Sequence, residues 1–144
     1  MIKIICVGKL KEKYLKDGID DYLKRINKYH KIEIIELPDS NITEEGNNIL
    51  KHISNKDYVI TLCIEGNELS SVELSDKIDK IFVSNPCITF VIGGSDGIRA
   101  DIKEKSNYKL SFSKLTYPHG LFRLILLEQI YRSFKIRNNE TYHK

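Results

Sequence analysis

Short apolar runs alternate along the chain with longer segments whose apolar residues are spaced as on one face of a helix. The apolar runs predict strands at residues 2–7, 32–37, 58–64, 87–92 and about 108–112. The helical spacing predicts helices at residues 12–29, about 42–54, from Ser70 onward, near 98–106 and from Pro118 to about Lys135. This alternation predicts one α/β domain over residues 1–144, with a mostly parallel sheet and flanking helices.

Two local signals lie between the third and fourth predicted strands. Glu65-Gly66-Asn67 predicts a turn directly after the third strand. Ser70 and Glu73 have the spacing of a capping box, which predicts the start of the next helix. The residues of that helix expected to face inward are Val72, Ile78, Ile81 and Phe82.

The carboxyl ends of parallel strands are the expected ligand-binding edge of such a sheet. This rule selects the loops at residues 65–67, 93–97 and 113–117. In the second, Gly93-Gly94-Ser95-Asp96-Gly97, glycines permit positive φ and close approach of the backbone to a ligand. The loop carries neither the GxGxxG dinucleotide fingerprint nor a GK[ST] phosphate loop. A plain strand-to-helix turn therefore stays open as the alternative.

The last predicted helix is apolar on nearly all sides, and a helix of this kind needs cover on every side. In a chain of 144 residues a second copy is the expected cover, so we predict a homodimer. His119 and Arg123 lie four positions apart on this helix, as do Glu128 and Arg132. The second pair is either part of a site or a surface ion pair without a catalytic role.

Charge is distributed unevenly, although the net charge is only +3. Residues 1–31 carry +5, residues 32–98 carry −8 and residues 99–144 carry +6. Two basic ends suggest an anionic partner, with ordinary solvated faces as the alternative. The terminal Tyr142-His143-Lys144 combines an aromatic ring, an imidazole and a cation. It is suited to base stacking and phosphate contact, unless it is simply a frayed polar tail.

Several classes of protein fit the sequence poorly. Cys6, Cys63 and Cys87 sit inside apolar runs, and their odd number argues against a disulfide framework. The four histidines have no zinc-ligand spacing, so we expect no metal, and no GxSxG motif indicates a hydrolase. No apolar stretch approaches the ~20 residues of a membrane span, and the N-terminus does not resemble a signal peptide. We expect a cytoplasmic protein without membrane association.

Several segments together resemble the ribosomal RNA large-subunit methyltransferase H family, within the SPOUT class of S-adenosylmethionine-dependent methyltransferases. They are FVIGGSDGI at 90–98, LSFSKLTYPHGLFRLILLEQIYRSFKI at 110–136 and the terminal YHK, supported by Val7-Gly8-Lys9 and ITLCIEG at 60–66. The resemblance covers nearly the whole chain. It implies a homodimer whose C-terminal part forms a trefoil knot around S-adenosyl-L-methionine. The cofactor contacts that it implies are Leu62, Gly93, Phe112, Ser113, Lys114, Leu115, Thr116 and Tyr117.

The implied reaction is methylation of N3 of a pseudouridine in 23S rRNA, in the large ribosomal subunit beside the decoding centre. Because N3 carries a proton that must leave, the reaction calls for a base, for which His143 is our first candidate and Glu128 the second. Tyr142, Lys144 and Arg132 would hold the RNA. In a dimer, one protomer's tail would complete the partner's site.

Departures from the family pattern concern mainly the tail, where Asn138-Asn139 and Thr141 replace residues more common there, and the segment near 39–46 is short. Two other functions stay open from the residues alone. The basic ends also suit a non-catalytic RNA-binding or ribosome-assembly module. The glycine turn also suits a different α/β enzyme, such as a flavodoxin-like nucleotide binder.

Overall fold

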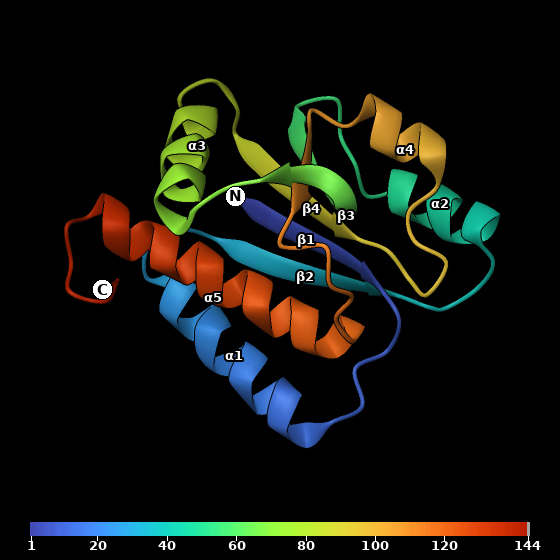
Figure 1. Cartoon of the computed structure of the whole chain (residues 1–144), viewed down its shortest axis with the longest axis horizontal. Coiled ribbons are helices and arrows are strands. Elements are labelled where there is room, and N and C mark those ends of the chain that lie inside the picture. Colours follow the sequence, from blue (N-terminus) through green and yellow to red (C-terminus); the bar gives the residue numbers. More distant parts are fainter. Residues whose placement is uncertain (144) are drawn as a thin grey trace.

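The computed structural model describes residues 1–143, which form one parallel sheet with helices on both of its faces (Figure 1). The sheet order is β2-β1-β4-β3-β5, with β1 (Ile2–Val7), β2 (Ile32–Leu37), β3 (Asp57–Glu68), β4 (Cys87–Ile92) and β5 (Tyr108–Ser111). The helices are α1 (Lys13–Asn27), α2 (Ile42–Leu50), α3 (Ser71–Ser84), α4 (Ala100–Lys105) and α5 (His119–Arg137). The predicted α/β class and parallel sheet are confirmed.

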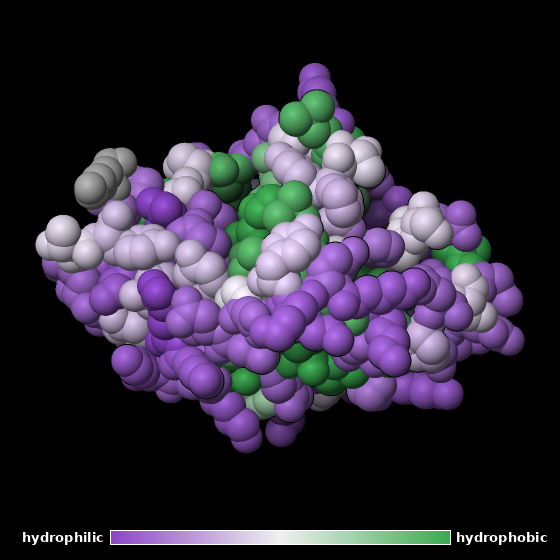
Figure 2. All heavy atoms as spheres, turned by 90° about the horizontal axis from the view of Figure 1, so that it is seen from below, coloured by the Kyte–Doolittle hydropathy of each residue, from purple (hydrophilic) through white to green (hydrophobic). Residues whose placement is uncertain are grey.

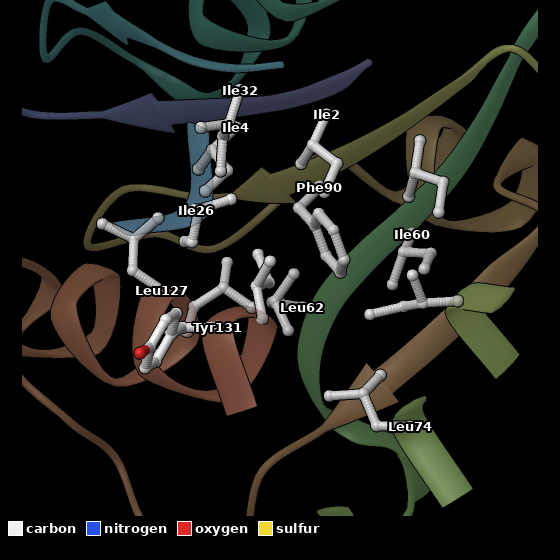
Figure 3. Packing of buried hydrophobic residues seen from close by; sticks show 14 of the residues in the cluster. Ile2, Ile4, Ile26, Ile32, Ile60, Leu62, Leu74, Phe90, Leu127 and Tyr131 are labelled. Atoms are coloured by element: carbon white, nitrogen blue, oxygen red, sulfur yellow. The ribbon is translucent and has the colours of Figure 1, made fainter. Parts of the chain in front are cut away.

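Both faces of the sheet are buried, which explains why its central strands are continuous apolar runs. Successive side chains of a strand point to opposite faces. In β1, Ile4 therefore belongs to the larger core under α1, α3 and α5, whereas Ile5 belongs to the smaller core under α2 and α4. In Figure 3 Phe90 of β4 lies among Ile2, Ile60 and other residues of the larger core.

Helix α5 packs between α1 and α3 and supplies the deepest helical residues of the larger core. Leu126, Leu127 and Ile130 are completely buried. The opposite side of the helix is only partly covered, and Leu121 keeps 37% of its surface exposed. The predicted need for further cover therefore applies to one side of α5 and not to its whole circumference.

Three local predictions differ from the structure. Helix α2 ends at Leu50 and not near residue 54. Residues 65–67 lie inside β3 instead of forming a turn, because an irregularity lets the strand continue to Glu68. Val72 is 53% exposed, because it lies in the first turn of α3 on the side away from the sheet. The capping box of Ser70 and Glu73 is confirmed, with the two reciprocal hydrogen bonds measuring 3.1 and 2.8 Å.

Two further expectations concern the chain as a whole. Within residues 1–143, no helix combines the length and the apolar character needed to cross a membrane. The trefoil knot stays a prediction from the family resemblance, since strand order and register describe the pairing of strands and not the threading of the loops.

Candidate functional site

A cavity of about 490 Å³ opens at the carboxyl ends of β3, β4 and β5. Its volume falls within the range of about 300–1,000 Å³ that small-molecule sites occupy. The walls come from the end of β3, the glycine turn after β4, and the loop that leads from β5 into α5. The cavity therefore lies at the edge of the sheet that the strand-end rule selects.

The wall from β3 arises from a break in strand pairing. Leu62 and Asn67 both pair with Leu110 of β5, so the residues between them leave the ladder as a bulge. Cys63 and Glu65 of this bulge line the cavity. The strand-end rule thus selected part of the cavity wall, although the bulge itself has no signal in the apolar pattern.

The glycine turn forms a wall made mostly of backbone. A Cβ atom on Gly93 would lie 2.6 Å from the carbonyl carbon of Gly97, so no larger residue fits there without moving the turn. Gly97 has a φ of +81°, and its N–H donates a hydrogen bond to the carbonyl oxygen of Gly94 at 3.0 Å. The turn consequently presents backbone groups and little side-chain volume to the cavity.

The loop at residues 112–117 is held by its own side chains. The hydroxyls of Ser113 and Tyr117 lie 3.1 Å apart, and Ser113 Oγ accepts the N–H of Leu115 at 3.0 Å. The rings of Phe112 and Tyr117 both pack on Phe122 of α5, at 5.1 and 5.7 Å between centroids. The backbone of this loop is thereby fixed as the third wall of the cavity.

Seven of the eight residues expected to contact a cofactor line this cavity: Leu62, Gly93, Phe112, Ser113, Leu115, Thr116 and Tyr117. Lys114 is exposed and does not line it. Sequence reasoning did not select Cys63 and His119, which also contribute to the walls.

Charged groups are few in the cavity. Lys103 Nζ lies 2.7 Å from Glu65 Oε1 at the rim, and this hydrogen bond lowers the pKa of Glu65. Burial raises the pKa of the Cys63 thiol, and the nearby Glu65 adds to the effect. Cys63 is therefore an uncharged wall residue at neutral pH and not an activated nucleophile.

A second group of functional candidates gathers on the middle of α5, where the C-terminal tail folds back. Glu128 accepts hydrogen bonds from the hydroxyl of Tyr142 at 2.8 Å and from Arg132 Nη2 at 2.9 Å. Arg132 Nη1 lies 2.9 Å from His143 Nδ1, and its guanidinium lies over the Tyr142 ring at 4.9 Å. Glu128, Arg132, Tyr142 and His143 are called the C-terminal cluster below.

The tail within this cluster is anchored and not frayed. Burial raises the pKa of Tyr142, and its hydrogen bonds with Tyr22 and Glu128 raise it further. Tyr142 therefore remains a hydrogen-bond donor at neutral pH. The hydrogen bonds from Arg132 to Glu128 form the predicted ion pair, which here also organises the tail. Lys144, the remaining RNA-contact candidate, lies outside the described residues.

The cavity and the C-terminal cluster are separate in one chain. Among the described residues, no member of the cluster lines the cavity. The cavity contacts the N-terminal end of α5, whereas the tail folds back beside the C-terminal half of that helix, next to α1, and reaches Glu128 at its middle (Figure 1). Sequence reasoning expected both groups to serve one reaction, and the structure does not bring them together within a single protomer.

A buried arginine fixes the first loop of the chain beside the cavity. Arg123 is 3% exposed, and it donates hydrogen bonds to the carbonyl oxygen of Gly8 and, at 2.7 Å, to Glu36 Oε2. Glu36 also accepts the N–H of Leu10 at 3.0 Å. Burial alone would raise the pKa of Glu36, but these hydrogen bonds and the nearby charge of Arg123 lower it overall. The spacing of Arg123 from His119 was visible in the sequence, but its burial was not.

The part of the chain that the structure describes contains no group of three or more His, Cys, Asp or Glu side chains placed to hold a metal ion. All three cysteines are free thiols, with Cys6 and Cys87 buried.

A family model described as "Predicted SPOUT methyltransferase" matches residues 1–143. Two solved structures share the fold, with low sequence identity. A methylase family protein from Haemophilus influenzae Rd KW20 has a TM-score of 0.59 at 14% identity, over 99% of this chain and 70% of that chain. A TrmH/SpoU tRNA modifying enzyme from A. aeolicus has a TM-score of 0.51 at 11% identity, over 95% of this chain and 77% of that chain. The chain belongs to the SPOUT methyltransferase family.

Sequence relatives narrow this assignment. Proteins named ribosomal RNA large subunit methyltransferase H are 50% identical to the chain in Alkaliphilus oremlandii and 48% identical in Enterococcus faecalis and Clostridium botulinum. Each of these matches covers 99% of both chains. Within the SPOUT methyltransferases, the chain groups with these enzymes. A methyltransferase is thereby favoured over a non-catalytic RNA-binding module or a flavodoxin-like nucleotide binder.

Proposed function

We propose that this protein transfers a methyl group from S-adenosyl-L-methionine to N3 of a pseudouridine in 23S rRNA of the large ribosomal subunit. The observation that carries the proposal is the cavity itself. Seven residues that the family resemblance assigns to the cofactor come from three separate segments of the chain and line one cavity at the strand ends. The names of the full-length relatives supply the RNA class of the substrate.

The walls of the cavity suit this cofactor. Leu62, Phe112 and Leu115 offer apolar surface for a flat adenine ring, and the backbone at Gly93 permits close approach. When bound, S-adenosyl-L-methionine supplies an electrophilic methyl group on a positively charged sulfur. The task of the protein is mainly to orient donor and acceptor in line, and the internally bonded loop at residues 112–117 provides a fixed wall for this purpose.

The C-terminal cluster supplies groups for the acceptor. His143 is exposed and is our candidate for accepting the N3 proton, with Glu128 as the second candidate. Because the side chain of Glu128 already accepts hydrogen bonds from Tyr142 and Arg132, its nearer role is to hold the tail. The ring of Tyr142 and the cations of Arg132 and Lys144 would contact the RNA.

The separation of cavity and cluster supports a homodimer in which each tail serves the partner's cavity. The uncovered side of α5 offers the surface for such contact, with Leu121 37% exposed, and Leu115 in the preceding loop is 70% exposed. Figure 2 shows hydrophobic atoms exposed near the centre of the face seen from below Figure 1, between hydrophilic ones. Two copies that bury this surface would bring one protomer's tail toward the other's cavity.

Exposed lysines in the first loop of the chain support RNA binding. Lys9 and Lys11 lie in the loop that Arg123 holds at Gly8, and Lys13 begins α1. Basic residues on an exposed segment neutralise phosphates, and binding of this kind weakens as the salt concentration rises. We place the protein in the cytoplasm, where it meets ribosomes.

The test is methyl transfer from tritiated S-adenosyl-L-methionine to large ribosomal subunits with and without pseudouridine at the target position. We expect incorporation only into subunits that carry pseudouridine, with the methyl group on N3 by mass spectrometry of nucleosides. Equal incorporation into subunits with uridine at that position would contradict the substrate assignment. Absence of saturable cofactor binding in calorimetry would contradict the proposal as a whole.

A further inference from the structure

A buried acidic side chain that the proposed reaction does not use lies behind the glycine turn. Glu45 of α2 is 4% exposed. Its Oε2 atom accepts the N–H of Ser40 at 2.8 Å, whereas its Oε1 atom is buried and has no hydrogen-bond partner among the described residues. An unpaired polar atom in the interior weakens the ligand-free fold, so its retention needs a reason.

The unpaired oxygen faces the turn. A Cβ atom built on Gly94 would lie 3.1 Å from Glu45 Oε1 and 3.1 Å from a methyl group of Val7. Gly93 and Gly94 line the cavity as well. The glycine turn therefore lies between the cavity on one side and the carboxyl group of Glu45 on the other.

Helix α2 also holds the segment that follows the turn. Arg99 Nη1 donates hydrogen bonds to the carbonyl oxygen of Thr43 at 2.9 Å and to Asn47 Oδ1 at 2.8 Å. The turn is thus fixed at its start by β4 and beyond its end by Arg99. Between these points Gly94 and Gly97 pair as an isolated antiparallel bridge, with the N–H of Gly97 donating to the carbonyl oxygen of Gly94.

We propose that Glu45 is a positioning residue for the cofactor, acting through the glycine turn. When S-adenosyl-L-methionine fills the cavity, the turn settles against α2, and a backbone N–H of Gly94 or Ser95 donates a hydrogen bond to Glu45 Oε1. The inference rests on the proposed function, because it assigns to Glu45 a part in binding that cofactor. Glu45 contacts the turn from behind and does not touch the reacting atoms.

The variant that tests this is Glu45→Gln, which preserves the shape of the side chain. Its amide oxygen can still accept the N–H of Ser40, but its NH₂ group then faces the turn and cannot accept a backbone N–H. We expect cofactor affinity in calorimetry to fall about tenfold. We expect the melting temperature of the ligand-free variant to stay close to that of the wild type, because one unpaired buried polar atom replaces another.

A matched control is Glu44→Gln in the same helix. Glu44 is exposed and also bonds to Ser40, through the hydroxyl, but it does not reach the turn. This variant should bind the cofactor like the wild type. In hydrogen-exchange measurements, the amides at residues 93–97 should gain protection on cofactor binding in the wild type and in Glu44→Gln, and gain less in Glu45→Gln.

Two results would overturn the inference while leaving the proposed function intact. One is wild-type affinity and wild-type protection in Glu45→Gln. The other is a loss of affinity accompanied by a fall in the ligand-free melting temperature, which would show a purely structural role. A wild-type protein that binds no S-adenosyl-L-methionine would contradict the proposed function, and this inference with it.

Discussion

The cavity and the C-terminal cluster lie at different points of the same helix and differ in character. The cavity is formed by apolar side chains and backbone, with one ion pair at its rim. The cluster combines a carboxylate, a guanidinium, a phenol and an exposed imidazole. The first can bind a flat, partly apolar ligand, and the second can bind anions and move protons.

The distance between the two regions is set by helix geometry. Phe122, at the cavity, and Glu128, in the cluster, are separated by about 9 Å along α5 according to the rise of an α-helix. A methyl donor and its acceptor must be in contact when the methyl group moves. This separation supports the proposal that the cavity and the C-terminal cluster are two half-sites, which a second protomer would bring together.

The largest expected effect is a loss of cofactor affinity when the cavity is blocked. In Gly93→Val the added side chain overlaps the backbone of Gly97, so we expect cofactor affinity to fall at least about 100-fold. Calorimetry measures this directly. Asp96→Ala in the same turn is the control, since Asp96 is exposed and does not line the cavity, and it should bind normally. Normal binding by Gly93→Val would remove the turn from the cofactor site.

The next largest effect is on the methyl-transfer rate, and it distinguishes the role of the cluster from the role of the cavity. His143→Ala should lower the methyl-transfer rate about 100- to 1,000-fold, as expected for loss of a general base, and leave cofactor affinity unchanged. Single-turnover kinetics with ribosomal subunits measures the rate. His52→Ala, a substitution outside both regions, should retain the wild-type rate. A full rate for His143→Ala would remove His143 from the mechanism.

A smaller loss of methyl-transfer rate is expected when the hydrogen bonds that anchor the tail to Glu128 are weakened. Glu128→Gln replaces a carboxylate that accepts hydrogen bonds from Arg132 and Tyr142 with a weaker acceptor. We expect the methyl-transfer rate to fall about tenfold. We also expect faster proteolysis of the chain after residue 137. Glu104→Gln, at an exposed position on α4, should change neither. If Glu128→Gln were as inactive as His143→Ala, Glu128 would be the better candidate for the base.

The smallest effect on activity is expected far from both regions, at the amino ends of the strands. Asp57 forms an ion pair with Lys3 at 2.7 Å and accepts a hydrogen bond from Thr89 at 3.0 Å. Burial alone would raise the pKa of Asp57, but these contacts lower it overall. A lowered pKa in the folded state gives stability that is present above the ordinary carboxyl range and is lost as the pH falls below about 4.

Asp57→Asn should therefore lower the free energy of unfolding at pH 7 by about 3 kcal/mol and weaken its dependence on pH between about 2 and 4. Chemical denaturation at several pH values measures both. Cofactor affinity and methyl transfer at 25 °C should stay unchanged. A specific loss of activity would show that the two half-sites depend on this distant part of the sheet.

Much of the fold could be predicted because the central strands are buried on both faces. The bounds of β1, β2 and β4 agree with the apolar runs, which glycine, proline or polar residues end. The bulge in β3 could not be predicted, because it depends on the register with β5, and the pairing of distant strands leaves no local pattern.

In the candidate site, too, some features could be predicted from the sequence and others could not. The strand-end rule selected the glycine turn and the loop at residues 113–117, whereas the individual cofactor contacts came from the family resemblance. The burial of Arg123 and of Glu45 could not be predicted, because a charged residue on a helix usually faces solvent, and only the tertiary structure shows that these two are buried. The contact of Tyr142 with Glu128 depends on how the tail folds back, which periodicity does not show.

The most direct test of the central claim, a site shared between two protomers, uses the two inactive variants together. Gly93→Val and His143→Ala are co-expressed with different affinity tags, and heterodimers are isolated by two successive purifications. Such a dimer contains one intact cavity that faces one intact tail, so the account predicts about half of the wild-type methyl-transfer activity. A heterodimer as inactive as its parents would show that each protomer must use its own tail, and would contradict the account.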